Sequence, residues 1–165
     1  MNPILNKEPV KRATKSIKDF DPNLIIVCLE QTARTAQDAA TALGCNVGAI
    51  AKSLLFSFGD NFVLCLVSGD KKCSLNKLKK ILNERDVFLA EPEDVKRITG
   101  YTIGGVSPVG HLNKVKIFVD KNLERFKNVF AAAGHPNCIF KIEYKQLLKL
   151  TSGEIEELTE WDNQN

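Results

Sequence analysis

The stretch "GAIAKSLLFSFGDNFVLCLVSGD", residues 48–70, decides the fold of this chain. Two runs rich in aliphatic and aromatic residues flank "GDN", where glycine allows a positive φ and Asp60 and Asn61 offer local hydrogen bonds. This pattern predicts a β-hairpin. One lysine, Lys52, interrupts the first apolar run, although desolvating an ammonium group costs several kcal/mol unless it is paired.

Outward from the hairpin, the periodicity of apolar residues predicts five helices, over residues 10–20, 32–44, 74–85, 91–100 and 143–153. Thr35 and Asp38 resemble a capping box, and Gly44 ends the helix that follows. Further strands are expected at residues 24–29 (buried), 86–90, 115–120 and 154–158, and on both sides of the tight loop "GHPN" within residues 128–142. Strands and helices alternate only in part, which favours an α+β fold with a mixed sheet.

Length and composition indicate a single domain over residues 1–165, with residues 1–10 and 160–165 loosely held. A net charge of +3 permits contact with a phosphate backbone without requiring it. Five cysteines without a C-x-x-C pair predict reduced thiols and a cytoplasmic protein. No signal-peptide core and no apolar run of about 20 residues occurs, so no membrane contact is expected.

Several motifs are absent, and their absence excludes whole classes of enzyme. The chain has no P-loop, no G-x-G-x-x-G and no G-x-S-x-G elbow. Its two histidines, His111 and His135, are far apart and lack the neighbouring residues of a zinc site. We therefore expect neither a metal nor another cofactor.

Four features remain as candidates, and each also has an ordinary structural explanation. Lys52 begins a strand beside a loop, but it could simply lay its stem on apolar surface. Asp120 ends a strand, and it could serve as a helix N-cap. The other two features are loops, "GGVSP" and "AGHPN". Glycines in the first let the backbone approach a ligand, and the histidine in the second titrates near neutral pH, yet either loop could be an ordinary turn. Their candidate residues are Gly104, Gly105, Val106, Ser107, Pro108, Gly134 and His135.

Taken in order, the segments "RTAQDAATALGCNVGAIAKSLLF", "GDNFVLCLVSGD", "ITGYTIGGVSPVG", "IFVD" and "AAAGHPNCIFKI" closely resemble the YbaK family. Members of that family are free-standing aminoacyl-tRNA editing domains, similar to the insertion domain of bacterial prolyl-tRNA synthetases. The resemblance covers about residues 32–158. It implies a curved, barrel-like mixed sheet wrapped by helices, with the site in a pocket at the sheet edge.

The resemblance also implies an activity, the hydrolysis of the ester between a wrong amino acid and the 3′ end of a tRNA. The required lysine of the family matches Lys52, which we expect to lie across a glycine-lined cavity from the two glycine loops and to hold the carbonyl oxygen or a terminal phosphate. The G-x-x-x-P loop matches residues 104–108, and the backbone N–H groups of residues 104–107 would fix the carbonyl or the surroundings of the substrate amine. Gly134, His135 and, less securely, Asp120 match further family positions, and Ser53 borders the pocket. No general base is assigned, and no cofactor is needed.

The substrate is expected to be a small amino acid, such as Ala, Ser, Thr, Cys or 2-aminobutyrate, on a tRNA of the tRNA-Pro type. The tRNA would bind through its acceptor end, and an aminoacyl-tRNA synthetase is a second candidate partner. Clustered lysines would contact phosphates, either Lys71, Lys72, Lys77, Lys79 and Lys80 or Lys114 and Lys116. The alternatives are a non-catalytic tRNA- or synthetase-binding adaptor of the same fold and a general small-ester or thioester hydrolase.

Overall fold

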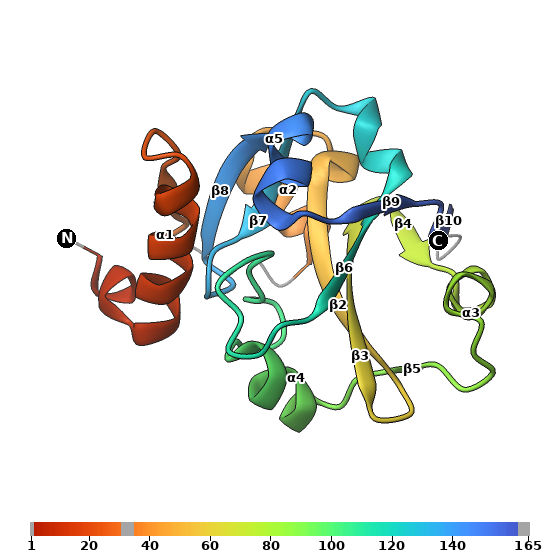
Figure 1. Ribbon diagram of the computed structural model, residues 1–165. Helices are drawn as coiled ribbons and strands as arrows, with labels where there is room; N and C mark the ends of the chain where they lie inside the picture. The colour runs from red at the N-terminus through yellow and green to blue at the C-terminus, as the bar shows by residue number, and fades with distance from the viewer. Residues whose placement is uncertain (1, 31–34, 162–165) are drawn as a thin grey trace.

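The hairpin of residues 48–70 forms the centre of a mixed sheet in the computed structural model, which describes residues 2–30 and 35–161 (Figure 1). Strands β2 (Ile50–Phe58) and β3 (Asn61–Ser68) pair antiparallel over their full length. Gly59 adopts a φ of 60° in the turn between them. The predicted hairpin is therefore confirmed, with its turn at the predicted glycine.

Eight strands make up this sheet, in the order β1-β8-β7-β2-β3-β6-β9, and β5 pairs with β2 beside this path. The β2–β7, β3–β6 and β6–β9 pairs are parallel, whereas the other pairs are antiparallel. The expected α+β fold with a mixed sheet is confirmed. The bounds of the remaining strands in this sheet are β1 (Ile26–Cys28), β5 (Phe88–Leu89), β6 (Lys116–Asp120), β7 (Asn128–Ala132), β8 (Cys138–Glu143) and β9 (Glu154–Glu156).

The five predicted helices are present within the described residues. Residues 32–34 of the second predicted helix lie outside the described residues, and Thr35 caps that helix by accepting a hydrogen bond from the Asp38 N–H at 3.1 Å. Gly44 ends it in the left-handed region. The helices are α1 (Glu8–Phe20), α2 (Ala36–Leu43), α3 (Leu75–Leu82), α4 (Pro92–Thr99) and α5 (Tyr144–Thr151), and the short 3₁₀ helices are η1 (Pro3–Asn6), η2 (Val47–Ala49) and η3 (Lys121–Arg125).

Helices cover both faces of the sheet, because alternate residues of β2 and β3 point to opposite sides and both sides are apolar. One face packs against the buried residues Val10, Ala13 and Ile17 of α1, which lies beside β8 (Figure 1). The other face packs against Leu78 of α3. None of the helices in the described residues combines the length and the apolar character needed to cross a bilayer.

Three predicted details differ from the structure. Residues 1–10 were expected to be loose, yet η1 and the start of α1 occupy most of them. Residues 160–165 were expected to be loose; residues 162–165 lie outside the described residues, but 160 and 161 belong to β10 (Thr159–Trp161), which pairs antiparallel with β4 (Lys71–Cys73) in a second, two-stranded sheet. Strand β1 was expected to be buried, but it lies at the end of the strand order and Val27 is 47% exposed. These short segments carry too little periodicity to be recognised without their partners.

Candidate functional site

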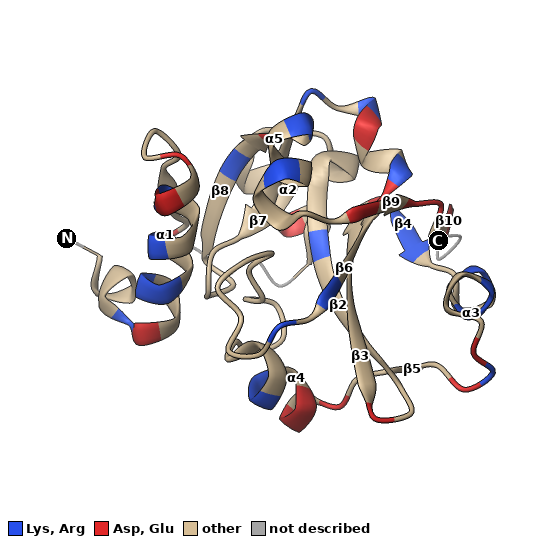
Figure 2. Ribbon diagram, viewed as in Figure 1, with Lys and Arg blue, Asp and Glu red and all other residues tan. Residues whose placement is uncertain are grey.

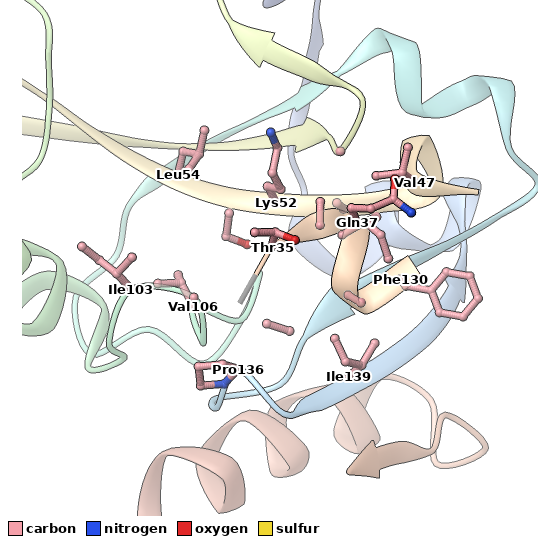
Figure 3. A pocket seen from close by; sticks show the side chains of 18 of the residues that line it. Thr35, Gln37, Val47, Lys52, Leu54, Ile103, Val106, Phe130, Pro136 and Ile139 are labelled. Carbon is pink, nitrogen blue, oxygen red and sulfur yellow. The ribbon is translucent and has the colours of Figure 1, made fainter. Parts of the chain in front are cut away.

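A cavity of about 790 Å³ lies over the first half of β2, within the size range of small-molecule sites (Figure 3). Its walls come from the start of α2, from β2, from the loop at residues 103–106 and from β7 and Pro136. Most of the lining is apolar. The polar side chains among the described lining residues are Thr35, Gln37, Lys52, Ser53 and Asp70. The cavity thus lies over a central strand, where loops converge, and not at the sheet edge as expected.

Lys52 lines this cavity together with Gly104 of one glycine loop and Pro136, which follows His135 in the other. The Nζ atom donates a hydrogen bond to the carbonyl oxygen of Lys71 on β4 at 2.9 Å. In Figure 3 the side chain extends from β2 toward β4, away from Pro136. The ammonium therefore lies at the rim of the cavity nearest β4.

Ser53 offers an unused hydrogen-bonding group at the cavity. Its Oγ atom is buried and has no hydrogen-bond partner among the described residues. A buried hydroxyl group without a partner costs about 1–3 kcal/mol, so such a group is rare in a folded protein. Both residues, Ser53 and Lys52, line the cavity, but because β2 is a strand, their side chains leave it on opposite faces of the sheet.

The two glycine loops pack directly against each other. A Cβ atom on Gly105 would lie 2.8 Å from the Cα atom of His135, a contact closer than real side chains make. Gly104 has a φ of 89°, which favours glycine, and lies next to Pro136. Of the predicted loop residues, Gly104 and Val106 line the cavity. Gly105 belongs to the wall behind them.

The end of the "GGVSP" loop is buried, and hydrogen bonds fix it. Ser107 is fully buried; its Oγ atom accepts from the Val109 N–H at 3.2 Å, and its carbonyl oxygen accepts from His111 Nε2 at 2.7 Å. Pro108 is buried as well. These two predicted residues are absent from the cavity lining, and they hold the shape of the loop instead.

Helix α1 anchors this loop from outside through Arg12. The guanidinium donates from Nε to the carbonyl oxygen of Gly110 at 2.8 Å and from a terminal nitrogen to that of Gly100 at 2.9 Å. It also stacks 4.6 Å from the ring centroid of Tyr101, whose hydroxyl group donates to the Val109 carbonyl at 2.9 Å. Charge-assisted bonds of this kind are about twice as strong as neutral ones. The loop is therefore positioned from both of its ends.

The environment of His111 allows a prediction of how the stability of the folded protein depends on pH. Burial lowers the pKa of His111, and the nearby Arg12 cation lowers it further against the opposing effect of the bond to Ser107. Above the unfolded-state pKa of about 6.5, such a histidine is neutral in both states and the free energy of unfolding is at its highest. As the pH falls below that value, the unfolded chain binds a proton that the folded protein does not, and the free energy of unfolding decreases. We expect the melting temperature to drop between pH 7.5 and pH 5.5, and to drop less in His111→Gln, whose amide can still donate to Ser107. An equally steep fall in both proteins would contradict the assignment.

The remaining predicted residues, Gly134, His135 and Asp120, stand behind the cavity or away from it. Gly134 packs on α1, since a Cβ atom there would lie 2.6 Å from the Pro9 carbonyl oxygen. His135 accepts at Nδ1 from the Asn137 N–H at 3.0 Å, so it bonds to backbone within its own loop. Burial, followed by the charge of Lys7, lowers the pKa of His135.

Asp120 was expected to contact substrate, and the structure gives it a different role. Its carboxylate is fully buried and absent from the cavity lining. It caps η3 by accepting from the Asn122 N–H at 3.1 Å, and it accepts from the Thr159 hydroxyl at 3.0 Å. The N-cap explanation for Asp120 is therefore the correct one, because the strand end that carries it points into the protein.

Sequence reasoning missed part of the cavity wall. Asp70 lines the cavity and forms a two-pronged ion pair with Arg125, at 2.8 and 3.0 Å. Although burial raises it, hydrogen bonds from Arg125 and Ser68 hold the pKa of the Asp70 carboxyl below its ordinary value. The hairpin could have pointed to Asp70. Ser68 pairs with Ala51, so the residues that follow Ser68 must lie near the start of β2. Thr35, Gln37, Phe130 and Ile139 had no comparable signal.

No three His, Cys, Asp or Glu side chains of residues 2–30 and 35–161 gather in a way that could hold a metal ion. All five cysteines are free, and the Sγ atoms of Cys28 and Cys138 lie 3.0 Å apart on paired strands.

Comparison with known proteins gives a consistent result. A family described as "Aminoacyl-tRNA editing domain" matches residues 30–150. The uncharacterized protein YwhH of Bacillus subtilis (strain 168) is 32% identical over 127 residues, which cover 76% of this chain and 80% of YwhH. Proline–tRNA ligase of Thermosipho melanesiensis (strain DSM 12029 / CIP 104789 / BI429) is 37% identical over 95 residues, 58% of this chain but only 17% of the ligase.

A crystal structure described as that of a "putative trans-editing enzyme for prolyl tRNA synthetase" has the same fold. It superposes with a TM-score of 0.88 and 35% sequence identity over 93% of this chain and 98% of that one. The profile match extends over well more than half of the chain and includes the hairpin, Lys52 and both glycine loops. The chain therefore belongs to the family of aminoacyl-tRNA editing domains.

Proposed function

We propose that this protein is a trans-editing hydrolase, which cleaves the ester bond between tRNA-Pro and a small amino acid attached to it in error. The observation that carries the proposal is the cavity itself, whose mostly apolar lining includes the Lys52 side chain and the unpartnered Ser53 hydroxyl among a few polar groups. Family membership supports an aminoacyl-tRNA as the substrate. The similarity to proline–tRNA ligases supports tRNA-Pro as the carrier.

The cavity walls favour a small side chain. Alanines at positions 36, 39, 51 and 132 line it and leave space without polar groups. The Ser53 hydroxyl can bond to a polar atom of the ligand, which would satisfy a group that the protein leaves unpaired. Steric exclusion discriminates by only about 1–3 kcal/mol per methylene, so several small amino acids should be accepted.

The reaction needs positioning more than activation, because an aminoacyl ester is already a high-energy bond. Water adds to the carbonyl carbon, the bond to the ribose oxygen breaks, and a proton passes to that oxygen, which leaves the free amino acid and an intact tRNA. Backbone N–H groups near Gly104 would hold the carbonyl oxygen as it gains negative charge. No side chain is assigned as a general base.

Lys52 would bind the tRNA end from the rim of the cavity. In this structure its ammonium donates to the Lys71 carbonyl, on the side of β4. A phosphate of the terminal nucleotides on that side would take over this bond, since a compact ammonium is a good partner for a phosphate oxygen. Of the two roles considered for Lys52, phosphate binding agrees better with this orientation than contact with the carbonyl oxygen does.

A panel of charged tRNAs tests the proposal. The wild-type protein is incubated with tRNA-Pro carrying Ala, Ser, Thr, Cys, 2-aminobutyrate or Pro, and release of the amino acid is measured. We expect at least one small amino acid to be released about 10-fold faster than proline. No release from any of these tRNAs, together with retained tRNA binding, would refute the hydrolase and favour the non-catalytic adaptor.

A further inference from the structure

Trp161, the single tryptophan of the chain, stands on the surface close to the candidate site. It is the last residue of β10 and lies directly opposite Lys71 of β4. The residue is 57% exposed. Tryptophan is highly buried on average, so an indole exposed to this extent has surface to offer to a partner.

Cations surround this indole. The Nζ atom of Lys71 lies 3.8 Å from the ring centroid, and the guanidinium carbon of Arg125 lies 5.6 Å from it. Lys72 is the next residue along β4. We call Trp161, Lys71, Lys72 and Arg125 the Trp161 platform.

Carboxylates balance only part of this charge. Glu160 lies 3.6 Å from Lys72, and Asp70 pairs with Arg125. Within the described part of the chain, Lys71 has no carboxylate within ion-pair distance. Figure 2 shows further basic residues on α3 and acidic residues along β9, so the basic side of the platform faces β4 and α3.

The platform is linked to the cavity through one residue. Lys71 contributes its ammonium to the face of the indole and its carbonyl oxygen to the ammonium of Lys52, at 2.9 Å. Residues directly opposite each other in an antiparallel pair have Cα atoms about 5 Å apart. The backbone of Trp161 therefore lies within roughly 10 Å of the Lys52 ammonium, a distance that about three stacked nucleotides span at 3.4 Å each.

We propose that Trp161 is a stacking residue, which binds an unpaired base near the 3′ end of the RNA while Lys72 and Arg125 face its phosphates and the buried Lys71 supports the ring. The proposal rests on the proposed function, because it extends the binding site of the same RNA beyond the aminoacyl group. Every base offers a π-face, so stacking tolerates different sequences, and nearby cations add to it. An exposed aromatic ring among lysines and arginine matches this chemistry better than it matches an apolar protein surface.

The lone tryptophan makes the proposal directly measurable. The full chain is titrated with an uncharged RNA hairpin that ends in a single-stranded 3′ ACCA, and the indole fluorescence is followed. We expect saturable quenching with this hairpin and none with the same hairpin made blunt by removal of the unpaired end. In Trp161→Ala, affinity measured with a labelled hairpin should fall about 5- to 150-fold, whereas Trp161→Phe should retain most of it.

Phe88→Ala is the matched control, because Phe88 is an aromatic residue with 62% exposure on β5. It should bind the hairpin as the wild type does. Equal quenching by the blunt hairpin, or unchanged affinity in Trp161→Ala, would overturn the proposal. Both Trp161 variants could instead lose affinity together with a large fall in melting temperature. That result would show that the indole only covers Lys71, and it would also overturn the proposal.

This experiment separates the two proposals, because the RNA is uncharged and no chemistry is measured. Normal deacylation without quenching would leave the hydrolase standing and remove the stacking role. Quenching without deacylation of any charged tRNA would support the stacking role of Trp161 and refute the hydrolase.

Discussion

Replacing Lys52 by alanine is expected to lower the rate of deacylation of the preferred mischarged tRNA-Pro by about 100- to 1000-fold, the loss typical of one preorganised electrostatic contact. The variant loses the cation at the cavity rim and, with it, the hydrogen bond from Nζ to the Lys71 carbonyl. Such a bond contributes about 0.5–3 kcal/mol, so the protein should remain folded. Single-turnover deacylation measures the effect, and circular dichroism with thermal melting checks the fold.

Two further variants make this prediction specific to the position of the charge. Lys18→Ala removes an exposed lysine of α1 and should leave the rate unchanged. Lys52→Arg keeps the positive charge but replaces a compact ammonium with a larger, planar guanidinium, so we expect only partial activity. A wild-type rate in Lys52→Ala would refute the role assigned to this lysine, whatever the cavity contains.

Replacing Gly105 by alanine is expected to destabilise the protein by about 1–3 kcal/mol and to slow deacylation by about 100-fold. The new Cβ atom would lie 2.8 Å from the Cα atom and 3.0 Å from the backbone nitrogen of His135. Backbone atoms cannot rotate away, so the two loops must separate and the wall of the cavity must move. Chemical denaturation and single-turnover deacylation measure the two effects.

Gly59→Ala provides the control for this variant. Gly59 has a φ of 60°, and a Cβ atom there would meet nothing within 4 Å. The substitution should therefore cost about 1–2 kcal/mol through backbone strain alone and leave the deacylation rate unchanged. If Gly105→Ala retained the wild-type rate, the close contact of the loops would not matter for the reaction.

Much of the site could be predicted because its residues interrupt regular patterns. Lys52 breaks an apolar run, and the glycines of "GGVSP" break a segment without periodicity. Lys52, Ser53, Gly104 and Val106 all line the cavity. Asp120 shows the opposite case, since a polar residue at a strand end looks the same in sequence whether it faces a ligand or caps a turn.

The sequence by itself determined the secondary structure, the mixed sheet and the family of this protein. Alternation of apolar residues, turn glycines and helix caps are local signals, and local steric and hydrogen-bonding preferences enforce them. Only the tertiary structure decided that Lys52 turns toward β4, that the Ser53 hydroxyl is buried without a partner among the described residues, and that Trp161 lies opposite Lys71. These facts depend on contacts between segments far apart in the chain, such as β4 and β10, whose pairing no single stretch of sequence encodes.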